Sequence, residues 1–372
     1  MVSVKWKKVV GQDRIKEVLS SAAESESLGH AYLFCGETGT GTFAAALEFS
    51  MALLCENKED CPCYQCDSCK KVLKYSHQDL HVIMPVALQK EHSSSGKLNE
   101  NGWKYLSECV TSRINDPYKP QQFGSPPSIP VEWMREITHA IGRGSLGKGL
   151  NIAIMDGADM LKKESANTML KTLEEPPNNT LIILIAEKNY TVLPTIISRC
   201  QLLRFAALSP EILRSELAQR LSIEVSDPTL NSLIHTGSLG QSLELANNPP
   251  GEIIEKVSLF WKNCIERNWF EVVSDIDELT QSGDAAYFER FFHYLLQLLR
   301  FSFLDKYIDT ENYFKTDSSN RIELPSSVSP SEVERVVALC QDVLMGLRVR
   351  GNCSMILSDF ACSLMEIFDG KE

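Results

Sequence analysis

A glycine-rich segment, GETGTGTF, has the composition of a loop that binds nucleotide phosphates. Its glycines are Gly36, Gly39 and Gly41. It follows an apolar run at 31–35 and leads into an Ala- and Leu-rich stretch at 42–54, so a strand and a helix would flank it. The consensus loop continues with Lys and then Ser or Thr, whereas here Gly41 is followed by Thr42 and Phe43. The ammonium group that contacts the β- and γ-phosphates and the hydroxyl that binds Mg²⁺ are therefore both missing.

A second apolar segment, LNIAIMDGADML, predicts a strand within 150–161 that closes on acidic residues, the first of which is Asp156. In nucleotide hydrolases an aspartate at such a strand end holds Mg²⁺, and a glutamate directly after it polarises the attacking water. Here the next residue is Gly157. We therefore expect no ATP hydrolysis. Weak anion binding by the loop amides stays open, as does the alternative that the glycines serve only the tight turn.

Five of the twelve cysteines lie close together in the segment CENKEDCPCYQCDSC. Cys63, Cys66 and Cys69 form a C-x2-C-x2-C pattern, and Cys55 lies eight positions before Cys63. Four thiolates at this spacing predict a closed tetrahedral site for a structural Zn²⁺, within a module at about 55–76. Cys61 is an alternative to Cys55 as the fourth ligand. Free thiols and an iron–sulfur cluster are less favoured, the latter because no redox-partner motif accompanies the single short cluster.

The composition of the 372 residues is that of a soluble protein with two or three domains, with 43% hydrophobic and 23% charged residues. The net charge of −12 argues against binding nucleic acid through bulk charge. No apolar run approaches the roughly 18 residues that would span a bilayer, and the N-terminus lacks the apolar region of a signal peptide. We therefore expect a cytoplasmic location and no membrane partner.

Strands and helices must alternate to position these residues. The apolar patterns predict strands at 31–35, 79–85, 150–161 and 179–187, and helices at 4–29, 42–54, 131–144 and 162–175. This alternation is typical of a parallel sheet covered by helices. Polar, Pro- and Gly-rich ends mark 86–130 as an insertion of unknown role around a possible helix near 103–114. Beyond 207 the pattern is helical, and the segment at 285–308 is apolar over most of its surface, as in a core or an interface.

Several of these motifs together resemble the bacterial clamp-loader subunits of DNA polymerase III, which are AAA+ proteins. The glycine loop, the cysteine module, IMDGAD, ANTMLKTLEEPPNNTLIILIAE and LPTIISRCQLLRF follow one another in the family's order over roughly residues 8–207. The resemblance implies an α/β plus all-α fold. A RecA-like AAA+ domain at 1–207 would carry the inserted zinc module, followed by a three-helix lid domain at 208–249. A helical collar domain at 250–372 would hold a pentameric ring together.

The residues that are missing indicate the branch of this family. Gamma/tau members have an intact loop and an Asp-Glu strand end, whereas this chain has neither. In GSLGQSLEL, Gly240 occupies the position of the family's nucleotide-sensing arginine. The chain thus resembles the delta-prime branch, a stator without ATPase activity of its own in the DNA-directed DNA polymerase III holoenzyme. The resemblance implies gamma/tau and delta subunits as partners, ATP bound only by partner subunits, and access to the sliding clamp and primed DNA through the complex.

Arg199 is the residue that the resemblance makes catalytic. In the family, the arginine of the Ser198-Arg199-Cys200 motif projects into the ATP site of a neighbouring subunit, where it stabilises charge developing on the γ-phosphate. A guanidinium suits this role because it is always charged and forks onto phosphate oxygens. Without the resemblance, a surface arginine in an interdomain salt bridge is the simpler interpretation.

Two rival functions stay open. One is an active gamma/tau-like ATPase with an unusual loop, against which Thr42, Phe43, Gly157 and Gly240 all count. The other is a zinc-dependent DNA-binding module without catalytic activity. The acidic chain and the few basic residues near the cysteines do not favour it. Those basic residues include Lys70, Lys71 and Lys74.

Overall fold

The computed structural model describes most of the chain. The described ranges are 3–25, 28–94, 97–121, 127–145, 149–161, 163–227, 229–247, 251–282, 285–307, 322–325, 328–348 and 352–369. The chain divides into two compact units. Unit 1 comprises Met1–Gln121, Pro127–Leu221 and Gly237–Glu244, and unit 2 comprises Gln122–Pro126, Ser222–Thr236 and Leu245–Glu372. The division into three domains at 207 and 249 stays a prediction.

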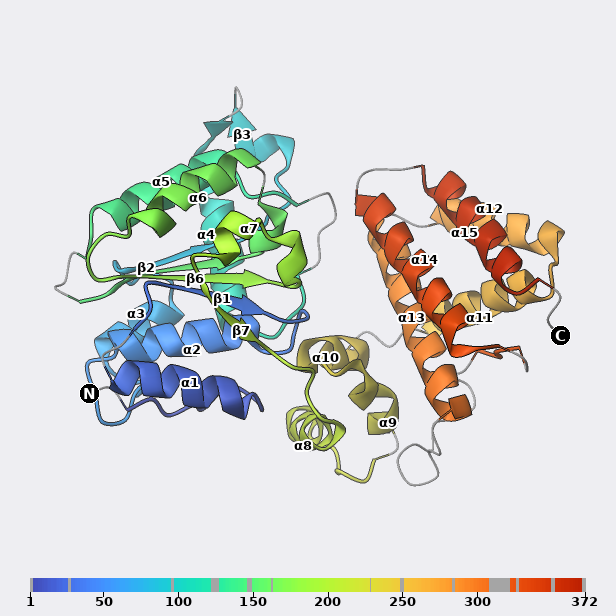
Figure 1. Ribbon diagram of the computed structural model, residues 1–372, viewed down its shortest axis with the longest axis horizontal. Coiled ribbons are helices and arrows are strands. Elements are labelled where there is room, and N and C mark those ends of the chain that lie inside the picture. The colour runs from blue at the N-terminus through green and yellow to red at the C-terminus, as the bar shows by residue number, and fades with distance from the viewer. Residues whose placement is uncertain are drawn as a thin grey trace. The chain divides into compact units, whose positions relative to one another are not determined.

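Unit 1 is built on a five-stranded parallel sheet (Figure 1). Its strands are β1 (Ala31–Cys35), β2 (Leu80–Ile83), β5 (Asn151–Asp156), β6 (Thr180–Ala186) and β7 (Gln201–Arg204), in the spatial order β2-β5-β6-β1-β7. Every residue of β1, β5 and β6 is buried, which explains their nearly continuous apolar sequences. The strand order reverses at β1, and in such sheets ligands bind at the carboxyl ends of the strands beside the reversal. The predicted parallel α/β architecture is confirmed.

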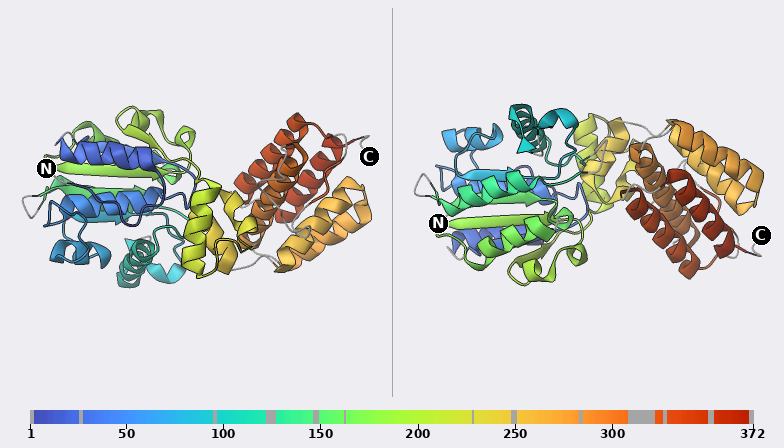
Figure 2. Two further views of the ribbon diagram at one scale, coloured as in Figure 1. Left: turned by 90° about the horizontal axis from the view of Figure 1, so that it is seen from below. Right: turned by 90° about the horizontal axis from the view of Figure 1, so that it is seen from above.

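Helices cover both faces of this sheet. Seen from below in Figure 2, α1 (Asp13–Glu24) and α2 (Thr42–Leu54) lie in front of one face. Seen from above, α5 (Val131–Gly142) and α6 (Lys163–Glu174) lie in front of the other. The bounds of β1 and α2 are those that the apolar patterns predict.

The helix predicted over 4–29 is wrong at both ends, because α1 covers only its middle. Gly11 and Gln12 have left-handed backbone angles, with φ of 58° and 59°, which a right-handed helix excludes. The backbone N–H groups of residues 7–9 donate to the side chain of Glu48 rather than to a helical turn. The N-terminal segment is therefore an extended strap that is bonded to α2.

The insertion at 86–130 has structure of its own. A 3₁₀ turn at Lys90–His92 leads into the antiparallel pair β3 (Ser93–Ser94) and β4 (Lys97–Leu98), and then into α4 (Glu100–Asn115). The side chain of Asn99 caps α4 by accepting from the N–H of Gly102. The predicted helix near 103–114 is thus present and longer.

The remaining elements of the described residues are helical. In the cysteine module lies α3 (Asp67–Leu73), and α7 (Pro194–Ile197) precedes β7. The three short helices predicted between 208 and 249 are α8 (Pro210–Leu221), α9 (Thr229–Leu233) and α10 (Leu239–Asn247).

Unit 2 contains five longer helices packed around an aromatic core. They are α11 (Gly251–Ile265), α12 (Trp269–Ser282), α13 (Ala285–Tyr307), α14 (Pro330–Arg348) and α15 (Cys353–Ile367). Phe292 of α13 meets Phe360 of α15 edge-on, with 5.0 Å between the ring centroids. The buried residues of α13 confirm the core packing expected for the apolar segment at 285–308. Among the described helices, none combines the length and the apolar character needed to cross a membrane.

Candidate functional site

The glycine loop joins β1 to α2 at the carboxyl edge of the sheet. Gly39 and Gly41 adopt left-handed backbone angles, with φ of 81° and 106°, which residues with side chains rarely adopt. Thr42 and Phe43 begin α2 and are buried, with exposed fractions of 5% and 0%. The turn geometry predicted for a phosphate loop is therefore present. The two residues that replace Lys and Ser/Thr are core residues.

Asp156, at the end of β5, has an arginine as its partner. Its Oδ2 accepts hydrogen bonds from Nε of Arg113 at 2.9 Å and from Nε2 of Gln121 at 2.9 Å. The ion pair is buried, with 8% of the Arg113 side chain and 11% of the Asp156 side chain exposed. The Arg113 guanidinium also lies 4.5 Å from the centre of the Phe43 ring. The insertion thus supplies a fixed cation to the carboxylate that would hold Mg²⁺ in an ATPase.

The backbone at Gly157 accounts for the missing glutamate. Gly157 has φ of 79°, and a Cβ placed on it would lie 2.5 Å from Cγ of Pro85. A glutamate here would be strained in its backbone and would collide with the proline ring. A glutamate at 157 therefore does not fit the local geometry after β5.

Tyr118 lies against the glycine loop from the side of the insertion. It is 1% exposed, and a Cβ on Gly41 would lie 3.2 Å from its hydroxyl oxygen. Gly240 approaches the same loop, because its N–H donates to the carbonyl of Gly39 at 3.2 Å. The structure thus brings together the glycine loop, Asp156 and Gly240. Side chains from α4 and from the turn after it lie between them.

Sequence patterns do not identify Arg113, Tyr118 and Gln121 as part of this site. Arg113 lies 43 positions and Gln121 lies 35 positions from Asp156 in the sequence. The signal that was available is general: a buried carboxylate at the end of a strand requires a cation or several hydrogen-bond donors. Nothing local indicates which cation.

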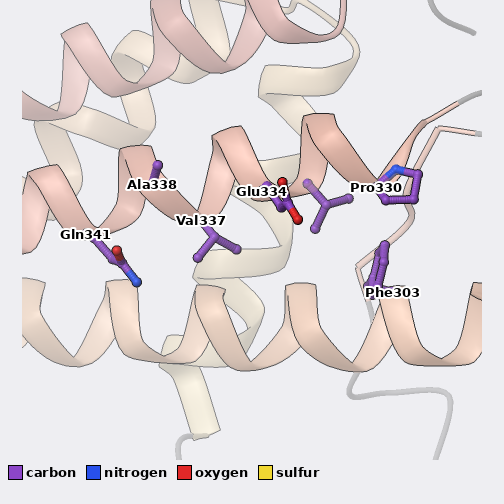
Figure 3. A pocket seen from close by; sticks show the side chains of 7 residues that line it. Phe303, Pro330, Glu334, Val337, Ala338 and Gln341 are labelled. Carbon is purple, nitrogen blue, oxygen red and sulfur yellow. The ribbon is translucent and has the colours of Figure 1, made fainter.

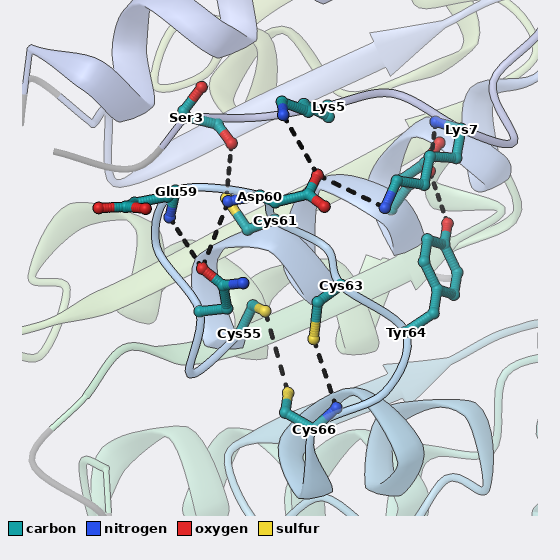
Figure 4. A network of polar contacts seen from close by, with 12 residues as sticks. Ser3, Lys5, Lys7, Cys55, Glu59, Asp60, Cys61, Cys63, Tyr64 and Cys66 are labelled. Atoms are coloured by element: carbon teal, nitrogen blue, oxygen red, sulfur yellow. Dashed lines mark hydrogen bonds and ion pairs between the residues drawn. The ribbon is translucent and has the colours of Figure 1, made fainter.

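The cysteine module brings four sulfur atoms together (Figure 4). The thiol sulfurs of Cys55, Cys63, Cys66 and Cys69 all lie within 4.8 Å of one another. Tetrahedral zinc with Zn–S bonds of about 2.3 Å implies sulfur–sulfur separations of about 3.8 Å. The Cys55 and Cys66 sulfurs lie 3.9 Å apart, so this donor set fits such an ion. Cys61 lies outside the group and donates instead to the carbonyl of Ser3 at 2.9 Å.

The thiols of this cluster differ in acidity. Hydrogen bonds from the backbone N–H groups of Gln65 and Cys66 lower the pKa of Cys63 to about 6. Burial raises the pKa of Cys69 well above its usual range. Because metal ligation requires thiolates, Cys63 is already suited to it at neutral pH, while Cys69 would lose its proton on binding the metal.

A buried carboxylate ties the module to the rest of unit 1. Glu48 of α2 is 2% exposed and accepts from the Tyr64 hydroxyl at 2.5 Å. It also accepts from the N–H groups of Lys7 at 2.8 Å and of Val9 at 3.0 Å. Figure 4 places Tyr64 beside Lys7, on the strap side of the module. The cysteine module therefore supports the N-terminal strap through α2.

Arg199 lies in a different environment, just after α7. Its Nη2 pairs with Oε1 of Glu174 at 2.8 Å, and its Nη1 donates to the carbonyl of Thr195 at 2.9 Å and to Oγ of Ser198 at 3.3 Å. The side chains of Arg199 and Glu174 are 35% and 49% exposed. Burial raises the pKa of the neighbouring Cys200 to about 11, which keeps this thiol protonated. Arg199 thus forms a salt bridge in the isolated chain, but within unit 1 and not between domains, and its guanidinium is open to solvent in part.

Each unit carries a groove. In unit 2, a groove of about 270 Å³ lies between α13 and α14, with Phe303 of α13 below Pro330 at one end of it (Figure 3). Val333, Glu334, Val337, Ala338 and Gln341 complete its lining. In unit 1, a groove of about 550 Å³ along α5 and α6 is lined in part by Arg135, His139, Arg143 and Lys171.

Comparison with known proteins gives a family match and curated relatives. The family model described as "DNA polymerase III, delta subunit" matches residues 11–209. The delta' subunit of DNA polymerase III from Bacillus subtilis is 28% identical over 249 residues, which cover 66% of this chain and 63% of that protein. The tau subunit from the same organism is 25% identical over 302 residues, which cover 75% of this chain and 46% of that protein. The chain therefore spans less than two thirds of the length of these relatives.

The similarity to solved structures is weaker. A DNA polymerase III gamma subunit-related protein from Thermotoga maritima is 12% identical, with a TM-score of 0.45, and the match covers 94% of this chain and 98% of that one.

Proposed function

Because the chain belongs to the DNA polymerase III delta subunit family, we propose that it is a delta-prime-like stator of a clamp loader. It would support ATP-driven loading of a sliding clamp onto primed DNA without hydrolysing ATP itself. Gamma/tau and delta subunits would be its partners, and ATP would bind to partner subunits.

One observation carries the stator proposal: the nucleotide-type site is filled by the chain's own side chains. Arg113 forms an ion pair with the carboxylate of Asp156, and the Phe43 side chain is buried in the core. A triphosphate with Mg²⁺ would have to displace a buried ion pair, and removing one partner from a buried pair typically costs about 3–5 kcal/mol. This argues against the active gamma/tau-like ATPase.

The proposal assigns Arg199 as an arginine finger for a neighbouring subunit. Its ion pair with Glu174 is exposed, and such pairs are worth only about 0–1 kcal/mol. A phosphate group of a neighbour's ATP can therefore compete with Glu174 for the guanidinium. In other nucleotide hydrolases such an arginine raises the rate by about 10³–10⁵-fold.

Zn²⁺ is proposed as the ion of the cysteine cluster, held by Cys55, Cys63, Cys66 and Cys69. When bound, it would stabilise the module without taking part in chemistry. A zinc-dependent DNA-binding module is the weaker alternative, because Tyr64 and Glu48 direct the module toward the core of unit 1.

The regions proposed as a lid at 208–249 and a collar at 250–372 would complete the subunit. The groove between α13 and α14 is apolar at Phe303, Val333 and Val337. Within a collar, it would be a surface for a helix of an adjacent subunit.

The test is the DNA- and clamp-stimulated ATPase rate of a loader reconstituted with Arg199→Ala. We expect the rate to fall strongly, because the site served by the arginine would lose its transition-state contact. Arg267→Ala is the matched control, since Arg267 is also an exposed arginine paired with a carboxylate, that of Asp369. Size-exclusion chromatography would establish that each ring assembles. An assembled Arg199→Ala ring that hydrolyses ATP at the unmodified rate would rule out the finger.

A further inference from the structure

The turn after α4 does more than fill space at the glycine loop. We propose that residues 113–121 are a tethered internal ligand of this cradle, which joins lid segments 208–221 and 237–244 to the sheet of unit 1 as a bound ligand would. The inference rests on the proposed function only in treating the loop as a nucleotide-type cradle. Three groups of contacts carry it.

The first group of contacts is made by Arg113, whose guanidinium stands in for the Mg²⁺ that such a site would hold. The Nη1 of Arg113 donates to the carbonyls of Pro117 at 3.2 Å and Lys119 at 2.7 Å, while its Nε holds Asp156. One guanidinium therefore fixes the turn and binds it to the end of β5. Because these acceptors surround a side chain that is 8% exposed, the turn and the strand are held as one piece.

The second group uses the phenol of Tyr118. Its oxygen accepts from the N–H of Val10 at 2.8 Å, and its hydroxyl donates to the carbonyl of Lys8 at 3.2 Å. Burial raises the pKa of Tyr118 to about 12, so the phenol keeps the proton that it donates. Both backbone groups belong to the strap that Glu48 also holds. The phenol thus satisfies one donor and one acceptor of the strap and ties the turn to it.

The third group reaches the lid segments. The guanidinium of Arg220, in α8, lies 5.2 Å from the centre of the Tyr118 ring. Any side chain at Gly240, in α10, would overlap the Tyr118 carbonyl oxygen. Next to it, Oγ of Ser238 donates to the carbonyl of Thr38 at 2.8 Å. The absence of an arginine at position 240 is therefore a steric requirement of the segment that occupies the cradle.

These contacts make the link between lid segments and sheet independent of nucleotide. In the described chain, α8 and α10 meet Tyr118 from two sides, and the glycine loop meets Gly240 directly. A subunit built this way would present one arrangement of unit 1 whether or not its neighbours hold ATP.

Hydrogen exchange of the isolated full chain, with and without MgATP, tests the proposal. In the unmodified protein we expect MgATP to leave the peptides that contain Val10, Gly41 and Gly240 unchanged. In Tyr118→Ala, we expect exchange in the peptides containing Val10 and Gly240 to accelerate about 2- to 10-fold, the range for losing one net hydrogen bond. Tyr75→Ala is the matched control, because the Tyr75 hydroxyl likewise bonds the N–H and carbonyl of Val82, and it should leave exchange at Val10 and Gly240 unchanged.

A second variant leaves Tyr118 in place and changes Gly240, which contacts the carbonyl of Tyr118. Gly240→Ala should push the segment out of the cradle and accelerate exchange at Val10, which is remote in sequence. Gly142→Ala, at another helical glycine with open space around its Cβ position, should not. Protection of the loop by MgATP in the unmodified protein would overturn the proposal. So would a folded Tyr118→Ala or Gly240→Ala protein with unchanged exchange at these positions. None of these results depends on Arg199, so the finger and the internal ligand can fail separately.

Discussion

Asp156 and Glu174 each pair with an arginine at almost the same distance, 2.9 Å to Arg113 and 2.8 Å to Arg199. Their surroundings differ. The Arg113–Asp156 side chains are 8% and 11% exposed, whereas those of Arg199–Glu174 are 35% and 49% exposed. A desolvated pair cannot be broken without leaving a buried charge, while an exposed pair can exchange partners with water or phosphate. Two ion pairs of equal length therefore differ in what they allow. The buried Arg113–Asp156 pair is a closed centre, whereas Arg199 can exchange its partner.

Removing a metal held by the four cysteines should have the largest effect, and it should fall on the cysteine module, outside both arginine pairs. With a strong chelator at neutral pH, we expect the module at 55–76 to lose its fold, because binding energies of structural zinc sites are about 10–16 kcal/mol in zinc-finger peptides. The strap at 3–12 should loosen with it through Glu48 and Tyr64. Metal content before and after chelation, with proteolysis of the strap, is the measurement. Cys362→Ser, at an exposed cysteine outside the cluster, should keep the metal. A chain purified without metal, yet with a protected strap, would contradict this.

Arg113→Ala comes next. We expect unfolding to require about 3–5 kcal/mol less free energy, since the carboxylate of Asp156 would stay buried without its cation. Chemical denaturation at neutral pH measures the loss. Asp156→Asn combined with Arg113→Met removes both charges and should restore much of the stability. If Arg113→Ala alone costs no more than an exposed pair, the contrast between the two centres is wrong.

Alkaline pH should act on the closed centre through Tyr118. Because burial raises its pKa to about 12, the protonated phenol is favoured in the folded state. Its contribution is complete below the unfolded value of about 10 and disappears as the pH rises through 12, a change of about 2–3 kcal/mol. The measurement is chemical denaturation of the unmodified protein and of Tyr118→Phe, at pH 8 and near pH 12. The difference between their free energies of unfolding should be smaller near pH 12 than at pH 8. A gap that is independent of pH would mean that the phenol is not held as described.

Arg199→Ala should have the smallest effect on stability, about 0–1 kcal/mol, despite its expected effect on the assembled loader. A double-mutant cycle with Glu174→Ala measures the coupling between the two residues, and added salt should weaken it. A coupling as large as that of Arg113 with Asp156 would show that the arginine is locked, and so unsuited to serve a neighbour.

Features that depend on neighbouring residues in the sequence were predicted well. The strand that leads to Asp156, the bounds of α2 and the four-cysteine set follow from short-range patterns of apolar residues, glycines and cysteines. The choice of Cys55 over Cys61 needed the structure, because it depends on Cys61 reaching Ser3. Arg113 and Tyr118 could not be predicted, because their partners lie far away in the sequence. The solvent exposure of a salt bridge depends on how the whole chain packs. The sequence therefore could not show that one arginine pair is buried and the other exposed.

The contact between Gly157 and Pro85 also bears on how such a subunit could change over time. To accommodate a glutamate at 157, the chain would need a new backbone conformation there and a different residue at 85. Neither change alone removes both the backbone strain and the clash with the proline ring. A side chain at 157 would therefore have to be acquired together with a change at 85.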